Sequence, residues 1–267
     1  MRKVISRNLF LYCPLTYMYV TRLGSATAVI GYVLSEFVPF ALTANLCYTV
    51  PVWKLALAFA GFLSLYELTY VRNDEVETAK EASRERLDGA FPPLWLFAAP
   101  RIVLGLIVAA VLWHELGAIR GGRFLVLSGF IVLLGSVHTW AGLQPIPWIR
   151  IITFAAMAAY KYAAWVVPFI SLRDTALLLM AGFLFYGLPR TGVYAARKLG
   201  SDAIAKSSGP QDTIRFGTLL VFAPLLFMAN RRDLDVLWCS YAGVLALTVS
   251  VARIRRSSML QSRRAHD

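Results

Sequence analysis

Long apolar segments recur along the whole chain, and they constrain its fold more than any other feature. Charged or Pro- and Gly-containing joints separate them, and several approach the roughly 20 residues that a helix needs to cross a bilayer. Of the 267 residues, 58% are hydrophobic and 16% are charged, whereas soluble domains average about 45–50% and 25%. A soluble core could not cover so many uninterrupted apolar runs. We therefore expect an all-α transmembrane bundle.

The spacing of these segments predicts about eight transmembrane helices, or nine, in a single integral membrane domain over residues 1–267. The expected spans are residues 15–40, 52–71, 94–113, 124–143, 148–170, 175–188, 216–229 and 236–251. No small-residue cleavage site follows the first basic residues, so we expect the first span to be retained. Its membrane part can begin after Arg22. The helices should surround a central cavity.

The basic residues are distributed unequally between the two sides of the predicted bundle. With the N-terminus in the cytoplasm, 18 of the 27 Lys and Arg residues fall on that side and six on the other. The positive-inside rule expects such a bias, so the net charge of +12 needs no nucleic-acid partner. We expect a bacterial inner-membrane protein with cytoplasmic active-site loops. Isolated Cys13, Cys47 and Cys239 predict neither disulfides nor structural zinc.

Acidic residues cluster directly after the second span. Six of the fifteen lie between Asp74 and Asp88. If the helix continues beyond the membrane, Asn73, Asp74, Glu77 and Glu81 come onto neighbouring turns. Their repulsion is relieved by Mg²⁺, which is usually held by carboxylates together with substrate phosphates, and Arg84 and Arg86 can contact further phosphate oxygens. The alternative is a solvated helix end with weak Glu–Arg pairs.

The run from Asn73 to Glu81 reads N-D-E-V-E-T-A-K-E. It resembles the first motif of the UbiA superfamily of intramembrane prenyltransferases, N-D-x-x-D-x-x-x-D, with Glu at the last two positions. The resemblance implies a UbiA-like bundle in which Asn73, Asp74, Glu77 and Glu81 hold Mg²⁺ and the diphosphate of an isoprenyl donor. Arg86 falls where the family carries a basic residue.

The second acidic motif of that family is not recognisable after the sixth span. Only Asp202 is acidic between residues 186 and 202. Arg190, Arg197 and Lys198 stand there instead, and they can bind the diphosphate directly with fixed positive charge. The alternatives are that they are ordinary cytoplasmic basic residues or that transferase activity has been lost.

Several residues inside the apolar segments are candidates to line the cavity. Lys161 lies deep in the fifth segment, where an unpaired ammonium would be costly, so it should face the interior, and Glu67 is a conceivable partner. The alternative is that its side chain extends to a membrane interface. We include Lys161 with Asp74 and Glu77 as candidate catalytic residues. Tyr66, Tyr70, Tyr162 and Trp165 could stabilise an allylic carbocation through their π faces.

These features lead to a Mg²⁺-dependent transferase that moves an isoprenyl group from an isoprenyl diphosphate to an aromatic or lipophilic acceptor. A terpene cyclase of the same family is one alternative, because the substrate's own double bond can act as the nucleophile. A transporter or non-catalytic membrane protein is the other, since charged residues at mid-membrane depth also mark carriers. Sequence leaves the donor chain length, the acceptor and the oligomeric state open.

Overall fold

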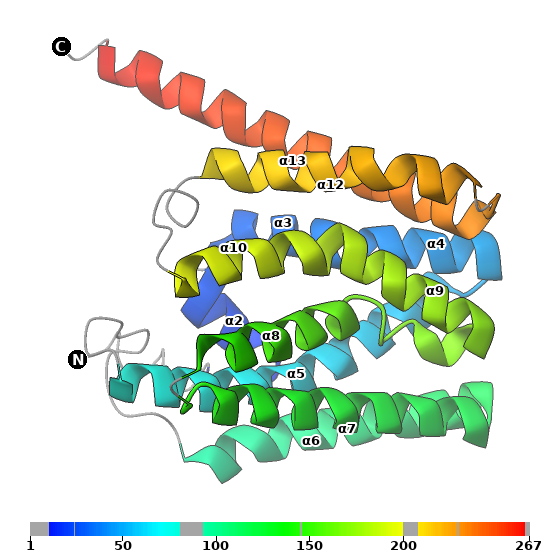
Figure 1. Ribbon diagram of the computed structural model, residues 1–267. Coiled ribbons are helices and arrows are strands. Elements are labelled where there is room, and N and C mark those ends of the chain that lie inside the picture. Colours follow the sequence, from blue (N-terminus) through cyan, green and yellow to red (C-terminus); the bar gives the residue numbers. More distant parts are fainter. Residues whose placement is uncertain are drawn as a thin grey trace.

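The chain folds into a bundle of helices. The structure is a computed structural model that describes residues 11–23, 25–80, 93–144, 146–199, 208–228 and 230–264. Over these ranges it contains helices and turns and no strand, which confirms the all-α class (Figure 1). The helices are α2 (Thr16–Met18), α3 (Ala26–Glu36), α4 (Val38–Tyr48), α5 (Val52–Lys80), α6 (Leu94–Leu116), α7 (Ala118–Ala141), α8 (Pro147–Lys161), α9 (Leu172–Gly182), α10 (Leu188–Lys198), α12 (Ser208–Met228) and α13 (Arg232–Arg264).

Within the described ranges, six segments are long and apolar enough to cross a membrane. They are Ala26–Tyr48, Val52–Asp74, Leu94–Leu116, Ala118–Ala141, Leu172–Ala196 and Arg232–Ser250. The chain is therefore a multi-pass membrane protein by the length and composition of its helices. The expected count of eight or nine is not confirmed, because the segments expected at 148–170 and 216–229 fall on α8 and α12, which are not among the six.

The fifth expected span differs from the structure for a clear reason. Helix α8 has 15 residues and ends at Lys161, so it is roughly 22 Å long and shorter than the ~30 Å hydrocarbon core. The following residues form turns and a short 3₁₀ helix, Val167–Phe169, and every residue from 161 to 170 is buried. This stretch is apolar because protein surrounds it.

The first span begins later than the hydrophobicity pattern predicts. Residues 16–23 form α2 and a π-helical turn, Tyr19–Leu23. A new helix, α3, then begins after Ser25, whose hydroxyl accepts a hydrogen bond from the backbone N–H of Ala28 at 3.2 Å. Such a cap satisfies one of the free N–H groups of the first turn. The apolar span therefore follows Arg22, and it comprises α3 and α4, which meet at Phe37.

The helices close into a ring. Contacts join α4 to α5, α5 to α7, α7 to α8, α8 to α10, α10 to α12, α12 to α13 and α13 back to α4, while α6 packs outside on α5 and α7. One hydrophobic core contains buried residues from α4, α5, α7, α8, α12 and α13. The ends of α5 and α10 lie at the same end of the bundle (Figure 1), so the residues that follow their apolar parts lie on one side of the predicted membrane.

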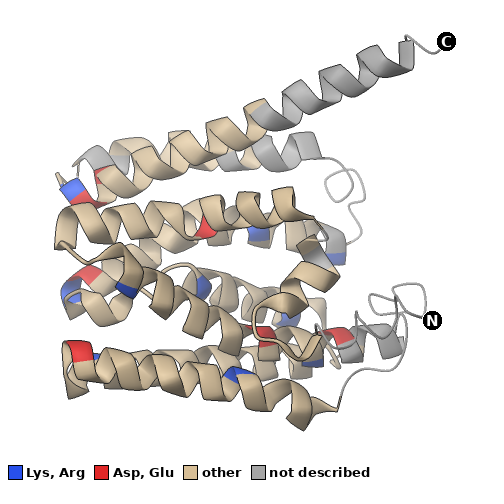
Figure 2. Cartoon of the chain, turned by 180° about the vertical axis from the view of Figure 1, so that it is seen from behind, with Lys and Arg blue, Asp and Glu red and all other residues tan. Residues whose placement is uncertain are grey.

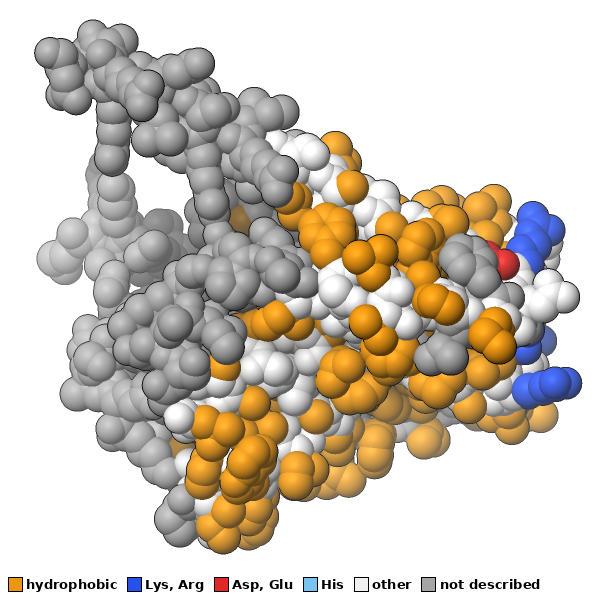
Figure 3. Space-filling model, turned by 45° about the horizontal axis from the view of Figure 1, so that its top comes forward, with side chains coloured by type: hydrophobic (Ala, Val, Ile, Leu, Met, Phe, Trp, Pro, Cys, Tyr) orange, Lys and Arg blue, Asp and Glu red, His pale blue; other side chains and the backbone are white. Residues whose placement is uncertain are grey.

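The outer surface of the bundle is apolar along its length. Large hydrophobic side chains such as Trp95, Ile119 and Val126 are at least 70% exposed. In Figure 3 hydrophobic side chains cover the visible flank, and Lys and Arg residues appear at one end. Because a monomeric soluble protein rarely exposes an apolar surface of this extent, the surface agrees with a bilayer as the surrounding solvent.

A buried ion pair fastens the N-terminal residues to α5 and α6. The Nε of Arg101 donates to Glu67 Oε2 at 2.9 Å, and neither side chain is exposed. The guanidinium also donates to the backbone carbonyls of Leu11, Cys13 and Phe97, and Glu67 accepts from the backbone N–H groups of residues 15 and 18. These hydrogen bonds satisfy both charges, which a buried pair requires.

Close helix contact at Gly135 leads to the first prediction. A Cβ atom at this position of α7 would overlap the side chain of Thr69 on α5, whereas one at Gly129 of the same helix meets nothing within 4 Å. We expect Gly135→Ala to destabilise the protein by about 1–3 kcal/mol through overpacking. Gly129→Ala should be neutral or stabilising. Unfolding in detergent, followed by circular dichroism, measures both, and equal midpoints for the two variants would contradict the packing.

Candidate functional site

Three charged side chains meet inside the ring. Glu36 ends α3, Lys161 ends α8, and Arg190 lies in the first turn of α10. Lys161 Nζ is 2.6 Å from Glu36 Oε2, and Arg190 Nη2 is 2.9 Å from Glu36 Oε1. Glu36 is 1% exposed and Lys161 5%. Charged residues are expensive inside a membrane and are retained there mainly for function. We therefore take this charged triad as the centre of the candidate site.

Tyrosine rings surround the ammonium group of Lys161. Its Nζ lies 5.0 Å from the ring centroid of Tyr32, 5.1 Å from that of Tyr66 and 5.2 Å from that of Tyr162. The ring of Tyr70 packs edge-on against Tyr66 at 4.9 Å. Rings at these distances attract a cation through their negative π faces. The structure thus places Tyr66 and Tyr162 around a positive charge and Tyr70 directly behind them.

Trp165 takes a different position from the other predicted aromatic residues. It is fully buried, and its ring packs on Phe37, Phe59 and Phe40, the first of these as a stack with 5.3 Å between centroids. Within the described part of the chain, its indole Nε1 has no hydrogen-bond partner. Trp165 therefore supports the helix joint next to Glu36 rather than the surroundings of Lys161.

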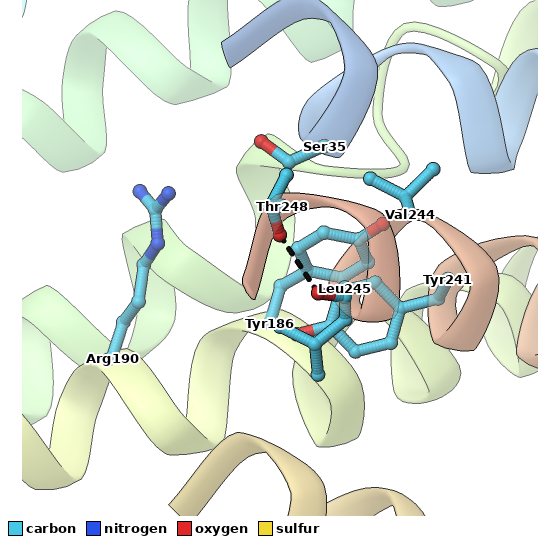
Figure 4. A pocket seen from close by; sticks show the side chains of 7 residues that line it. All are labelled: Ser35, Tyr186, Arg190, Tyr241, Val244, Leu245 and Thr248. Carbon is cyan, nitrogen blue, oxygen red and sulfur yellow. Dashed lines mark hydrogen bonds between the residues drawn. The ribbon is translucent and has the colours of Figure 1, made fainter. Parts of the chain in front are cut away.

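A small cavity adjoins Arg190. Its volume is about 50 Å³, and it is lined by Ser35 of α3, Tyr186, Arg190, and Tyr241, Leu245 and Thr248 of α13. Figure 4 shows Tyr186, Tyr241, Leu245 and Thr248 close together, with Arg190 to one side of them. A volume of this size holds a few water molecules or one small head group, whereas ligand pockets typically measure about 300–1,000 Å³. The cavity as it stands could not enclose an isoprenyl chain.

Tyr186 reaches this cavity from an irregular part of its helix. The chain forms a π-helical turn at Phe183–Gly187, between α9 and α10. Such turns are frequent at functional sites because the inserted residue changes the direction in which side chains point. The predicted sixth span ends before Pro189, but the structure continues the helix through it, since proline is tolerated in the first turn of α10.

The acidic motif lies at the end of α5, whose helix continues to Lys80 as the sequence predicts. Asn73 Oδ1 accepts a hydrogen bond from Arg150 Nη2 on α8 at 3.4 Å. Asp74 is 1% exposed, and its Oδ2 accepts from the hydroxyl of Tyr17 on α2 at 2.9 Å. The side chain of Glu77 lies outside the described residues, and so do Glu81, Arg84 and Arg86.

The described members of the motif do not form a metal site as they stand. Asn73 contacts α8 and Asp74 contacts α2, so their oxygens are directed to different neighbours. Across the described side chains no group of three His, Cys, Asp or Glu residues converges in a way that could hold an ion. A Mg²⁺ site here would require Asn73 and Asp74 to change partners or would depend on Glu77 and Glu81.

The other predicted basic residues occupy α10. Arg190 belongs to the charged triad. Lys198 lies eight residues further along the same helix, roughly 12 Å away along its axis, and its Nζ is 5.8 Å from the ring of Tyr194. Tyr194 in turn stacks on Phe154 of α8 at 4.2 Å. Arg197 also lies on α10, but its side chain is outside the described residues. The structure does not bring Lys198 to Lys161.

Sequence reasoning missed several members of the site and paired one residue with the wrong partner. Among those missed are Tyr32, Glu36, Arg150 and Tyr186. Glu36 is an acidic residue within an apolar segment and could have been found by that rule. The conceivable pair of Glu67 with Lys161 is wrong, because Glu67 binds Arg101 and Lys161 binds Glu36. Both acids lie in apolar stretches, so only the packing of the helices distinguishes them.

A second polar network lies at the other end of the bundle. Arg231, just before α13, donates to both carboxylate oxygens of Asp233 and to Asp174 at the start of α9. Asp233 also accepts from the hydroxyl of Tyr48 at 2.6 Å. Hydrogen bonds to Asp233 and Asp174 raise the pKa of Arg231. Figure 2 shows Lys, Arg, Asp and Glu residues at this end too. We assign this network a structural role in joining helix ends.

Comparison with known proteins adds no family to this description. No family model, no curated protein and no solved structure matches the chain. The resemblance of residues 73–81 to the first UbiA motif therefore rests on those residues alone.

The charged triad leads to a stability prediction. Lys161→Met leaves Glu36 paired with Arg190 alone, so the charges balance but the 2.6 Å contact of Lys161 Nζ with Glu36 is lost. We expect a loss of about 1.5–3 kcal/mol, the value of a buried hydrogen bond between charged groups. Lys54→Met is the control, because Lys54 pairs with the 35%-exposed Glu115 and solvent-exposed pairs contribute little to stability. Unfolding midpoints in detergent compare the two, and equal small losses would mean that the triad is not a buried pair.

Proposed function

We propose that the protein is an intramembrane prenyltransferase that binds an isoprenyl diphosphate inside the ring and transfers its isoprenyl group to a lipophilic acceptor. The observation that carries this proposal is the meeting of Lys161 and Arg190 among tyrosines in the ring interior. Two fixed cations suit the terminal phosphates of such a donor, because charge-assisted hydrogen bonds to phosphate are strong. Tyrosine faces suit an allylic cation.

The arrangement of α5 supports the same proposal. Tyr66, Tyr70 and Asn73 follow one another at helical spacing on this helix, so one face runs from the tyrosines in the interior to the acidic motif at its end. Helix α8 faces it, with Lys161 against Tyr66 and Arg150 against Asn73. A donor could therefore place its diphosphate between cations from α8 and α10 with its chain in the apolar interior.

The proposed chemistry follows from these groups. The bond between C1 of the donor and the diphosphate oxygen breaks, and the electron pair leaves with the oxygen, where Lys161 and Arg190 stabilise the developing charge. The allylic cation is stabilised by Tyr66 and Tyr162. The acceptor then forms a bond to C1 and loses a proton. Asp74 and Glu77 remain predicted catalytic residues, with Mg²⁺ as the predicted cofactor. Because the described motif residues do not converge, no step here depends on the metal.

The location of the protein follows from the charge distribution. We propose the bacterial inner membrane, with the N-terminus and the ends of α5 and α10 facing the cytoplasm, since most Lys and Arg residues fall on that side. The water-soluble diphosphate product would then be released into the cytoplasm.

A carrier is the second candidate, and the charged triad favours it. Paired charges inside a membrane bundle mark ion and substrate pathways in transporters. The cavity of about 50 Å³ is compatible with a small hydrophilic solute, and it must enlarge to take a prenyl chain. A carrier would move its solute without chemical change, which separates the two candidates.

The decisive assay is diphosphate release from geranyl, farnesyl and geranylgeranyl diphosphates by protein purified in detergent, with and without Mg²⁺. We expect Arg190→Gln to lower the rate by about 10²–10³-fold, the loss typical of removing one group that stabilises developing negative charge. Arg120→Gln is the matched control, because Arg120 is exposed at the start of α7. Asp74→Ala and Glu77→Ala test the motif and its metal.

The outcomes separate the candidates. Release that depends on Arg190, with a product coupled to an added acceptor, supports the transferase, and a cyclic hydrocarbon or alcohol would identify a cyclase instead. Absence of release from all three donors, even with cell extract supplying acceptors, would reject the enzymatic proposal and leave the carrier.

A further inference from the structure

The charges of the triad do not balance. Lys161 and Arg190 contribute two positive charges and Glu36 one negative charge, and Glu36 touches both cations. The site therefore carries a net charge of plus one in a place where unpaired charge is costly. One further anionic group would neutralise it, and it would have to approach Arg190 or Lys161.

The small cavity shows that an anionic group would approach Arg190 rather than Lys161. The side chain of Lys161 is 5% exposed, whereas that of Arg190 is 37% exposed, because Arg190 forms part of the cavity wall. Tyr186 lines the same cavity and is only 4% exposed, and its hydroxyl has no hydrogen-bond partner among the residues that the structure describes. A buried hydroxyl without a partner costs about 1–3 kcal/mol. A guanidinium and a phenol thus line one small space, and both are groups that can donate hydrogen bonds to an oxyanion.

The position of Glu36 would allow its carboxylate to move away from Arg190 when an anionic group binds. It is the last residue of α3, and α4 begins at Val38, with Pro39 in its first turn. The carboxylate is therefore placed at a joint between two helices, and a shift of α3 does not require α4 to unwind. Ser35, the neighbour of Glu36, lines the cavity, so the cavity and the carboxylate share the end of α3.

We propose that the cavity beside Arg190 binds the phosphate or carboxylate head group of a lipophilic molecule, and that Glu36 is a resident counter-ion which this head group displaces from Arg190. The idea rests on the proposed function in that the same two cations would hold the donor's diphosphate. It adds that the protein's own carboxylate occupies their anion site in the resting state. Affinity for the anion is then set by competition with Glu36.

Direct binding to the purified protein tests this without any reaction. The probes are inorganic pyrophosphate, decyl phosphate and decanol, titrated by calorimetry in detergent. Decyl phosphate should bind and decanol should not, because the head group is what the cavity recognises. Pyrophosphate reports whether a free anion suffices. We expect Glu36→Gln to tighten decyl phosphate binding on the order of tenfold or more, since the competing charge is gone and the site carries two positive charges.

Two controls make the result specific. Glu115→Gln removes a carboxylate paired with Lys54 outside the site and should leave the affinity unchanged. Arg190→Gln placed on Glu36→Gln should abolish the gain. Unchanged or weaker binding in folded Glu36→Gln protein would overturn the proposal, and so would equal binding of decyl phosphate and decanol.

Trp165 provides a second readout in the unmodified chain if Glu36→Gln does not fold. Its ring stacks on Phe37, the residue after Glu36, so displacement of Glu36 should change its fluorescence. The signal is the difference between wild type and Trp165→Phe during a decyl phosphate titration. Absence of binding, or binding without a Trp165-dependent change, rejects the displacement.

The result is independent of the transferase assay. Tighter binding in Glu36→Gln with no diphosphate release would keep the anion site and reject the enzyme. Release that requires Arg190, together with no effect of Glu36→Gln on binding, would keep the enzyme and reject the role of Glu36.

Discussion

The charged triad of Glu36, Lys161 and Arg190 is the interaction on which the arrangement of the bundle depends. An ion in hydrocarbon must be paired, and these three come from α3, α8 and α10, which are far apart in the sequence. Their contacts therefore require those helices to meet, and the ring that α4 and α13 close brings them to one interior. Tyrosines fill the space around the ammonium group of Lys161, so this charge has aromatic rather than aliphatic surroundings.

The pair of Arg101 and Glu67 contrasts with the triad, because both of its buried charges are neutralised and fully hydrogen-bonded, as expected for a structural ion pair. Arg101 directs its donors to one carboxylate and four backbone carbonyls, and Glu67 accepts from two backbone N–H groups in addition to Arg101. Both charges balance. The triad keeps a surplus positive charge beside a cavity and an unpartnered phenol. That difference, rather than burial itself, distinguishes a candidate binding site from a structural pair.

The acidic motif and the triad are related through two facing helices. Helix α5 carries Tyr66 in the interior and Asn73 at the bundle end, and α8 places Lys161 and Arg150 opposite them. A ligand with a charged head and an apolar chain could contact both regions. This geometry is why an isoprenyl diphosphate remains our preferred substrate, even though the present cavity is much smaller than such a chain.

Hydrophobicity along the sequence was enough to determine an all-α membrane bundle, because this property depends on residue type and helical spacing, which are local. The continuation of α5 into the acidic motif was a condition of the motif hypothesis, and an interior position for Lys161 was one of two alternatives. The shortness of α8, the later start of the first span and the partner of each buried charge were decided by tertiary structure. Lys161 has Glu36 and Glu67 as possible partners by composition, and only the ring brings Glu36 to it. A charge in an apolar segment is visible in a sequence, whereas its partner is chosen by which helices pack together.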